Sequence, residues 1–404
     1  MSRFIAYTTG RDLLMSQILP LPTETVSIES LYGRILAQDI TAKVNVPSFD
    51  RSPYDGYAFR SEDTAEASKD HPITLRILEE IPAGSVSHYP VTKGCAAKVL
   101  TGAPIPEGAN AVIKFEQTEF TAEAVTIFTP CKKDSNIVKT GEDVKTGDIL
   151  AQAGTKIDTG LAGTLASQNI TSALVYRIPR IGILSTGTEI LELGAESVPG
   201  KIYDSNRYML SAAVQNMGFT PVLYGPAVDR TEDICALIQK GLCECDALLI
   251  TGGVSVGDYD LTPAAMDMAG AETLFRGVDM KPGMACAYGI YDGKPICGLS
   301  GNPASAITNF HAIAAPVLRK LSGQTDCLPK EISVKLINGF RKKSPGTRFL
   351  RGILDLSDGT VRMFVSREQG NVVLSSTIGC NVIAIIPAGS DAIPDGAELK
   401  GFLI

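Results

Sequence analysis

Three turns rich in glycine, serine and threonine are the places where this chain could carry out chemistry. They are residues 185–189, 251–258 and 300–305, and each follows a short apolar run. Bare backbone N–H groups in such turns can cradle an anion, and a helix that begins there adds partial positive charge. Three turns of this kind in one part of the chain predict a ligand that carries several negative charges.

Four acidic residues at or beside these turns predict a second kind of chemistry. They are Glu189, Asp229, Asp258 and Asp260. A carboxylate beside a phosphate cradle is unfavourable unless a cation lies between them, and Mg²⁺ prefers such oxygen ligands. Taken alone, Glu189 is explained at least as well as an acid at a helix N-terminus, and loop aspartates commonly form turns or caps. Four acids expected at one edge of one sheet favour a functional role for at least two of them.

The same turns carry groups that can hold an oxyanion. Their glycines allow close backbone approach, their threonine and serine supply hydroxyls, and a proline near the first helical position leaves free N–H groups. The residues concerned are Thr186, Gly187, Gly252, Gly253, Ser255, Gly301, Asn302 and Pro303. Lys281, before Pro-Gly, could add local positive charge, although a lone surface lysine is usually solvated.

Alternating strands and helices over residues 177–320 must position these turns. Strands are expected near 181–184, 221–225, 246–251 and 295–299. Asp204 or Ser205 can cap the helix after the first strand, and Asp229 with Glu232 resembles a capping box for the next helix. The pattern predicts a doubly wound α/β domain with a parallel sheet, in which ligands bind beyond the carboxyl ends of the strands.

The rest of the chain predicts a multidomain α/β plus β protein. Residues 10–40 read as two helical pieces, and a second helical hairpin is expected from Thr159 onward. Because these helical regions flank a β-rich insert, we expect them to pack together as one discontinuous domain. Residues after 325 read as short strands separated by Gly and Pro, which is typical of a β barrel. The expected domains are residues 1–45 with 136–176, then 46–135, 177–324 and 325–404.

Composition excludes several classes of protein. The chain has 404 residues, of which 44% are apolar and 20% charged, as expected for a folded soluble protein with several domains. Its net charge of −7 disfavours nucleic acid or an anionic membrane as partner. The sequence contains no 18-residue apolar run and no apolar signal core, so we expect a cytoplasmic protein. Its nine cysteines form no C-x-x-C pair and are expected to be reduced thiols.

Eight motifs in order along the chain carry a family resemblance. They are PSFDRSPYDGYAFR, TGAPIPEGANAV, GED, STGTEI, YDSNRYML, TGGVSVGDYD, MKPG and SGNPAS. Together they resemble the molybdopterin molybdenumtransferases, the family of MoeA and the E domains of gephyrin and its plant counterpart. The resemblance covers essentially the whole chain. It implies a four-domain subunit with a molybdopterin-binding α/β domain, and a homodimer whose cleft lies between one subunit's α/β domain and the partner's β insert.

The resemblance also implies a reaction. Adenylylated molybdopterin and molybdate are the implied substrates, molybdenum passes to the dithiolene, and AMP is released with the help of Mg²⁺. The implied protein partners are the molybdopterin adenylyltransferase and acceptor molybdoenzymes.

Roles carry over to residues that match the motifs. Asp55 and Asp143 are implied to reach the cleft from outside the α/β domain as catalytic acids. Glu189, Asp229 and Asp260 are implied as catalytic acids and metal ligands on the sheet rim. Thr101 matches a family threonine at the site. Positions implied for molybdate or its approach are Lys281, Ser255, Ser305, Arg351 and Ser375 or Ser376.

The chain departs from the family pattern at four positions. Met284 and Ala285 follow Lys281-Pro282-Gly283 where the family often reads KPGKP, Ser300 replaces a usual proline, and Gly277 replaces a lysine of some members. The sequence therefore predicts a less basic molybdate site. Two alternatives stay open: a non-catalytic pterin-binding scaffold, which Met284 and Ser300 mildly favour, and a pyrophosphate hydrolase, which leaves the β insert unexplained.

Overall fold

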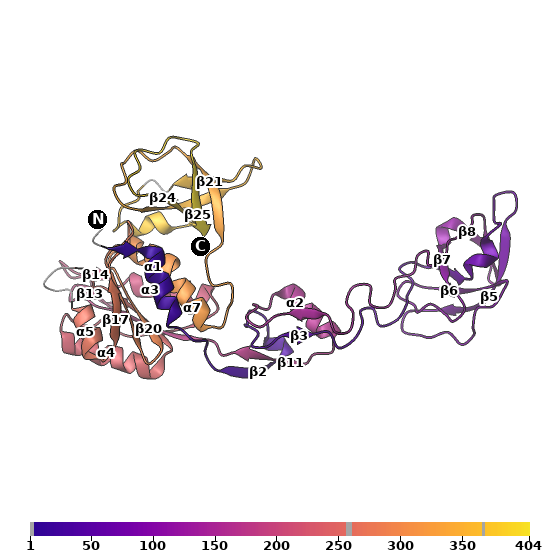
Figure 1. Cartoon of the computed structure of the whole chain (residues 1–404), viewed down its shortest axis with the longest axis horizontal. Coiled ribbons are helices and arrows are strands. Elements are labelled where there is room, and N and C mark those ends of the chain that lie inside the picture. Colours follow the sequence, from indigo (N-terminus) through magenta and orange to yellow (C-terminus); the bar gives the residue numbers. More distant parts are fainter. Residues whose placement is uncertain (1–3, 256–260, 366–367) are drawn as a thin grey trace. The chain divides into compact units, whose positions relative to one another are not determined.

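The computed structural model describes residues 4–255, 261–365 and 368–404 (Figure 1). The chain divides into two compact units. Unit 1 comprises Met1–Gln38, Ala153–Asp158 and Ser172–Ile404, and unit 2 comprises Asp39–Gln152 and Thr159–Thr171. The finer division into four domains stays a prediction.

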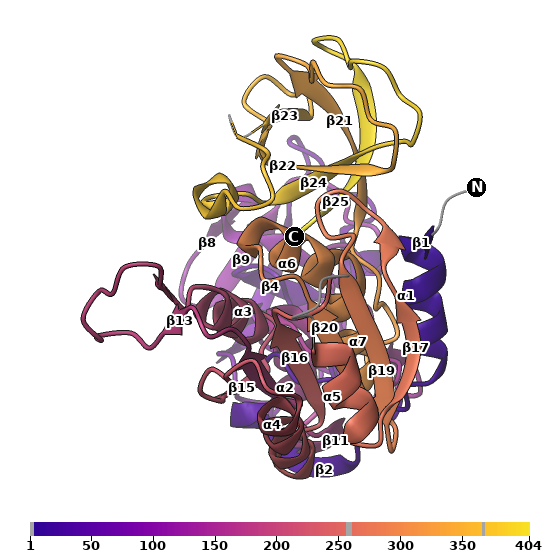
Figure 2. The same cartoon turned by 90° about the vertical axis from the view of Figure 1, so that its left-hand side faces the viewer.

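A six-stranded sheet forms the centre of unit 1, with the strand order β15-β12-β16-β20-β19-β17 (Figure 2). The strands are β12 (Arg180–Ser185), β15 (Thr220–Leu223), β16 (Ala247–Thr251), β17 (Glu272–Arg276), β19 (Cys286–Tyr291) and β20 (Lys294–Leu299). The first four in the order run parallel to one another, and β19 runs antiparallel to both of its neighbours, β20 and β17. The four predicted strands are present and parallel, but β19 and β17 were not predicted, and β19 makes the sheet mixed. Continuous buried runs such as β16 need cover on both faces.

Helices cover both faces of this sheet. One face packs against α1 (Tyr7–Ser16), α3 (Asn206–Asn216) and the pair α6 (Pro303–Asn309) and α7 (Ala315–Leu321). The other face packs against α4 (Thr231–Glu244) and α5 (Thr262–Met268). Each helix contributes its apolar stripe to one of two continuous cores, which fixes the strand ends where the glycine-rich turns emerge.

Two predictions about helix starts have different outcomes. Asp204 Oδ1 accepts a hydrogen bond from the backbone N–H of Arg207 at 3.1 Å, so Asp204 caps α3 as predicted. The predicted capping box at α4 is wrong, because its N-cap is Arg230 and has no side-chain cap. The carboxylate of Asp229 bonds instead to Thr188 in the neighbouring loop.

Other predicted helices are also corrected. Residues 28–36 form only a single 3-10 turn, Ile28–Ser30, because Ile35 and Leu36 pair in β-bridges with Lys156 and Val175. The predicted hairpin after Thr159 is one helix, α2 (Thr159–Ser167), followed by strand β11 (Ser172–Tyr176). Strand β11 pairs with β2 (Thr23–Ser27), and β1 (Ile5–Ala6) pairs with β18 (Val278–Asp279).

The C-terminal residues form a closed barrel in unit 1, as predicted. Its strand order is β21-β23-β22-β24-β25. The strands are β21 (Glu331–Ile337), β22 (Arg348–Asp355), β23 (Arg362–Val365), β24 (Val382–Ile386) and β25 (Glu398–Leu403). Buried side chains such as Val334, Leu350 and Met363 fill its interior.

The β-rich insert forms a six-stranded sheet in unit 2, with the order β7-β4-β6-β5-β9-β8. Its strands are β4 (Gly56–Phe59), β5 (Ile73–Ile81), β6 (Cys95–Val99), β7 (Ala111–Lys114), β8 (Thr118–Phe120) and β9 (Ala124–Ile127). A short pair, β3 (Ile40–Thr41) with β10 (Ile149–Ala151), lies in the same unit. Among the helices of the described ranges, none has the length and hydrophobicity of a membrane span.

His311 makes the stability of unit 1 sensitive to pH. It lies in a π-helical turn, Phe310–Ala314, between α6 and α7. Burial, with a smaller effect of the positive charge of Arg319, lowers its pKa from 6.5 to about 4. Between these values the unfolded chain binds a proton that the folded chain does not, so stability is lost as pH falls from 6.5 towards 4.

We expect the free energy of unfolding to fall by about 1–2 kcal/mol more between pH 7 and pH 5 in the wild type than in His311→Gln. Urea unfolding at both pH values measures this difference. His71→Gln, at an exposed histidine, is the control and should keep the wild-type pH dependence. An equal loss of unfolding free energy in His311→Gln and in the wild type would show that His311 does not cause the pH dependence.

Candidate active site

A cavity of about 630 Å³ lies at the carboxyl ends of β12, β16 and β20 in unit 1. All three predicted turns contribute to its wall. The predicted residues that line it are Thr186, Gly187, Glu189, Asp229, Gly252, Gly253, Ser255, Gly301, Asn302 and Pro303. This is the edge of a parallel sheet at which ligands bind. We call it the turn cavity.

Close packing of the three turns explains their glycines. Gly252 has φ +98°, in the left-handed region, and a Cβ there would lie 2.5 Å from the carbonyl oxygen of Thr186. The N–H of Thr186 donates to Thr251 at 2.8 Å, and the N–H of Gly252 donates to Leu299 at 3.1 Å. Only glycine fits at position 252 without moving the neighbouring turn.

Gly252→Ala is therefore expected to destabilise the protein by about 1–3 kcal/mol and to weaken ligand binding in the turn cavity. Gly194→Ala is the matched control, because Gly194 has φ +84° but no atom within 4 Å of an added Cβ. Comparing the thermal unfolding of both variants separates the cost of the steric clash from the cost of placing alanine at a positive φ. Equal losses of stability in the two variants would show that the neighbouring turn moves enough to remove the clash between the added Cβ and Thr186.

Two of the predicted acids lie together in this cavity. Asp229 Oδ2 accepts hydrogen bonds from the backbone N–H of Thr188 at 3.0 Å and from its hydroxyl at 3.2 Å. The carboxylate of Glu189 turns back over Gly187, whose N–H donates to Ala227 at 3.1 Å. Both acids therefore face the same space from adjacent loops.

Among the described residues, Glu189 and Asp229 are the predicted acids in the turn cavity that could bind a metal ion. Asp258 and Asp260 lie outside the described residues. Within those residues, no cluster of three or more His, Cys, Asp or Glu side chains could hold a metal ion. Mg²⁺ commonly binds proteins through one or two carboxylates and takes its other ligands from water and substrate phosphate. Glu189 and Asp229 fit that mode of binding.

Polar groups without a partner also line the turn cavity. The Ser185 hydroxyl is buried and has no hydrogen-bond partner within the described structure, and the same holds for Asn206 Oδ1. Asn206 Nδ2 donates to the carbonyl of Gly301 at 2.7 Å, which ties α3 to the third turn. Buried polar groups are normally paired with protein, water or ligand. Sequence reasoning missed both residues, although Asn206 lies in the YDSN motif.

A buried ion pair supports the same wall. Asp204, which lines the cavity, lies 3.1 Å from Arg207 Nε, and their side chains are 1% and 4% exposed. Arg207 also donates to the carbonyl of Tyr224 at 2.7 Å and to Glu192. Burial opposes the charge of Arg207, but the Glu192 hydrogen bond and the charge of Asp204 outweigh it and raise the pKa of the guanidinium.

Side-chain hydrogen bonds hold a loop beside the turn cavity. Residues 192–201 connect β13 (Ile190–Leu191) to β14 (Ile202–Tyr203) and extend from the body of unit 1 (Figure 2). Lys201 Nζ donates to the carbonyl of Thr188 at 3.0 Å, and the Tyr203 hydroxyl donates to Ala195 at 3.0 Å.

A second cavity of about 650 Å³ adjoins the first and contains the predicted Lys281, Ser255 and Ser305. We call it the lysine cavity. The two cavities share Val254, Ser255, Ala285, Ser300 and Asn302. Backbone hydrogen bonds to Thr347 at 2.9 Å and Phe349 at 2.8 Å hold Lys281 against the barrel. The exposed Met284, one of the departures from the family pattern, also lines this cavity and adds no charge.

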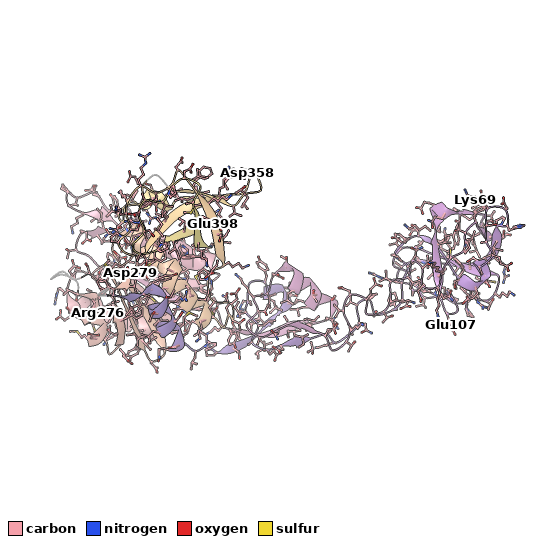
Figure 3. The ribbon with its side chains drawn as sticks, turned by 45° about the horizontal axis from the view of Figure 1, so that its top comes forward. Lys69, Glu107, Arg276, Asp279, Asp358 and Glu398 are labelled. Atoms are coloured by element: carbon pink, nitrogen blue, oxygen red, sulfur yellow. The ribbon has the colours of Figure 1, made fainter. Side chains whose placement is uncertain are left out.

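The segment before Lys281 brings one further charged residue, Arg276, to the lysine cavity. Figure 3 shows where Arg276 and Asp279 lie in unit 1. Arg276 lines the cavity. Asp279 Oδ2 accepts a hydrogen bond from the Thr347 hydroxyl at 2.9 Å, so this acid ties the segment to the barrel rather than facing a ligand.

Three predicted molybdate residues lie outside both cavities. Arg351 is buried, and its Nη2 donates to the Ser376 hydroxyl at 3.1 Å. Burial lowers the pKa of Arg351, and its Nη1 has no partner among the described residues. Ser375 is exposed on the same 3-10 turn. Val372 and Leu374, which precede these serines, do line the turn cavity.

The remaining predicted residues lie in unit 2. Asp55 Oδ1 accepts hydrogen bonds from the Thr101 N–H at 2.6 Å and the Thr101 hydroxyl at 2.8 Å, which lower the pKa of Asp55. The structure therefore brings these two predicted residues together. Asp143 is exposed in a turn, with its N–H bonded to the carbonyl of Val46 at 3.0 Å. Their approach to a partner's α/β domain stays a prediction.

Comparison with known families defines the class of fold and site. Residues 5–168 match the family described as the MoeA N-terminal region, domains I and II, and residues 182–320 match a probable molybdopterin binding domain. The second match contains all three turns. The crystal structure of the molybdopterin biosynthesis moeA protein from Pyrococcus horikoshii OT3 superposes with a TM-score of 0.86, at 31% identity and full coverage of both chains. The class is therefore that of MoeA proteins.

Curated relatives name the family more narrowly. A molybdopterin molybdenumtransferase of Bacillus subtilis is 36% identical over 389 residues, which cover 95% of this chain and 90% of the relative. One of Staphylococcus epidermidis is 35% identical over 383 residues, with 95% and 91% coverage. This chain belongs to the molybdopterin molybdenumtransferase family.

Proposed function

We propose that this protein is a transferase of molybdenum cofactor biosynthesis that inserts molybdenum from molybdate into adenylylated molybdopterin and releases AMP. The observation that carries the proposal is the pair of adjoining cavities. One combines three glycine-rich turns with two carboxylates, and the other contains a lysine and serine hydroxyls. A diphosphate and an oxyanion need these two environments side by side.

The turn cavity is the proposed site for the diphosphate of adenylylated molybdopterin. Thr186, Gly187, Gly252, Gly253, Gly301, Asn302 and Pro303 are the residues proposed to contact it. Backbone N–H groups in such turns, and the N–H groups at the start of a helix, suit phosphate oxygens. Ser185 and Asn206, whose buried polar atoms lack protein partners, join this proposed set.

Glu189 and Asp229 are the described residues proposed to hold Mg²⁺, and Asp260 is proposed as a third acid. When bound, Mg²⁺ supplies charge neutralisation at phosphate oxygens. The hydrogen bonds from Thr188 hold Asp229 Oδ2 in a fixed orientation, so no side-chain rearrangement is needed to present this acid to the cavity.

The lysine cavity is the proposed entry site for molybdate. Lys281 supplies positive charge, and Ser255 and Ser305 supply hydroxyls. Arg351, Ser375 and Ser376 are proposed to act on the approach of the oxyanion from the barrel. The positive charge of Lys281 makes this cavity suited to a dianion in a chain of net charge −7.

We further propose a cytoplasmic homodimer in which Asp55, Thr101 and Asp143 complete the partner's site. Among the described residues, the side-chain hydrogen bonds of Asp55 use only Oδ1. This orientation leaves Oδ2 able to accept a bond from outside unit 2. Docking to the molybdopterin adenylyltransferase and to acceptor molybdoenzymes belongs to the same proposal.

The test is a reaction of purified protein with adenylylated molybdopterin, Mg²⁺ and molybdate. The expected products are molybdenum cofactor and AMP, with AMP release dependent on molybdate. AMP release that does not depend on molybdate would favour a pyrophosphate hydrolase. Tight binding of the pterin substrate without turnover would favour a non-catalytic scaffold.

A further inference from the structure

A third cavity, of about 550 Å³, lies entirely in unit 2. We call it the insert cavity. Its wall consists of Tyr57, Ile77, Leu78, Glu79, Glu80, Lys98, Phe120, Thr121 and Ala122. None of the residues assigned above to substrate or metal lies in this wall, so the cavity needs an explanation of its own.

An irregularity of the insert sheet creates this cavity. Strand β9 pairs with β5 only over Ile73–Arg76, although β5 continues to Ile81. Beside the end of β9, β5 contains an extra residue between Ile77 and Glu80, where it pairs with β6. Such bulges are over-represented at sheet edges, at barrel rims and next to active sites. The space between the free end of β5 and the turn after β8 is the insert cavity.

Tyr57 is the residue in its wall that most needs a partner. Its side chain is 0% exposed, and its hydroxyl has no hydrogen-bond partner within the described structure. The ring packs against Phe115 and Phe120, with centroid distances of 5.1 Å and 5.8 Å. A phenylalanine would fill the same space without burying an unpaired donor. Without a ligand in the cavity, the hydroxyl therefore lowers the stability of the folded protein.

The mouth of the insert cavity is polar, with two glutamates and one lysine in its wall. Lys98 Nζ lies 2.8 Å from Glu80 Oε2 and 5.4 Å from the centre of the Phe115 ring. Glu79 is already used, because its carboxylate accepts N–H bonds from His88 and Tyr89 at 2.9 Å and 3.1 Å. The wall thus offers one unpaired donor, an ion pair that can accept or donate, and the exposed aromatic ring of Phe120.

We propose that the insert cavity binds a flat nitrogen heterocycle with a ring carbonyl next to a ring N–H. The ring would lie against Phe120, where aromatic contact is favourable, and its carbonyl would accept the Tyr57 hydroxyl bond. The ring N–H would donate to Glu80. This site is separate from the turn cavity and does not depend on the reaction proposed for it.

Methyl NMR of the full-length protein with hypoxanthine as the probe tests the proposal. Ile77 lines the insert cavity, whereas Ile190 and Ile202 line the turn cavity. With labelled isoleucine δ-methyl groups, hypoxanthine is expected to shift the Ile77 signal in a saturable way and to leave Ile190 and Ile202 in place. Cyclohexanecarboxamide, which has a similar amide but no flat ring, should bind more weakly.

Variants separate a ligand site from a structural hydroxyl. Tyr57→Phe is expected to weaken hypoxanthine binding about fivefold to tenfold and to leave the thermal midpoint unchanged or higher. Phe120→Leu, at an exposed side chain, should also weaken binding. Tyr89→Phe, at an exposed tyrosine outside the wall, is the matched control and should bind as wild type.

Three results would overturn the proposal. The first is an Ile77 signal that does not move at millimolar hypoxanthine, and the second is binding that is unaffected by Tyr57→Phe. The third is a fall of several degrees in the thermal midpoint of Tyr57→Phe, because it would show that the hydroxyl already makes a bond that stabilises the fold.

Discussion

Replacing Glu189 with glutamine is expected to slow molybdate-dependent AMP release by about 100-fold. The thermal midpoint should change by no more than about 2 °C, since Glu189 is exposed and an exposed side chain contributes little packing. Glutamine keeps the size of the side chain and removes its charge. The expected loss therefore reports the carboxylate and not its volume.

Steady-state AMP release at several Mg²⁺ concentrations is the measurement. If Glu189 holds Mg²⁺, a higher Mg²⁺ concentration should recover part of the lost rate in the variant and change the wild type little. Glu196→Gln is the matched control, because Glu196 is an exposed glutamate of the 192–201 loop outside the cavity wall. Unchanged turnover in Glu189→Gln would remove this residue from the proposed site.

The largest effect on stability is expected from Arg207→Met. This change leaves the carboxylate of Asp204 buried without its cation, and an uncompensated buried charge costs about 3–5 kcal/mol. Both side chains are almost fully buried, so water cannot replace the missing partner. The bond from Arg207 to the carbonyl of Tyr224 is lost as well.

Urea unfolding of single and double variants tests this expectation. Asp204→Asn combined with Arg207→Met should recover much of the stability, because the buried charge is then absent. Glu192→Gln is the control, since Glu192 is 52% exposed and its ion pair should contribute less than about 1 kcal/mol. A loss below about 1 kcal/mol in Arg207→Met would show that Asp204 is not effectively desolvated.

The parallel sheet and its turns were predictable from the sequence because each part follows from a local rule. Strand β16 is a short buried run of four apolar residues and a threonine, followed directly by two glycines, which is the pattern of a buried parallel strand with a ligand-binding turn. The C-terminal barrel shows short runs separated by Gly and Pro. Local pattern alone decides elements of this kind.

Elements that depend on distant partners were not predictable. Leu31, Ile35 and Leu36 have helical spacing, but Ile35 and Leu36 pair with Lys156 and Val175, far along the chain. Similarly, Asp229 looks like a helix cap until the fold brings it against Thr188. In both cases a tertiary contact overrides a local preference.

The site was predictable only as a set of residues, because burial and partner geometry have no local signal. The motifs identify Arg351, but they do not indicate that its guanidinium lies buried against Ser376 outside both cavities. The unpaired atoms of Ser185 and Asn206 likewise depend on which neighbours are absent in three dimensions. No spacing in the sequence encodes that.

The turn cavity and the lysine cavity share lining residues, including Ser255, Ala285 and Asn302. This shared wall has a consequence for inhibition. Because the same residues line both cavities, a compound long enough to reach past them would compete with both proposed reactants at once. A short compound would block one chamber and leave the other open. Inhibitor length alone would then switch the kinetic pattern from competition with one reactant to competition with two.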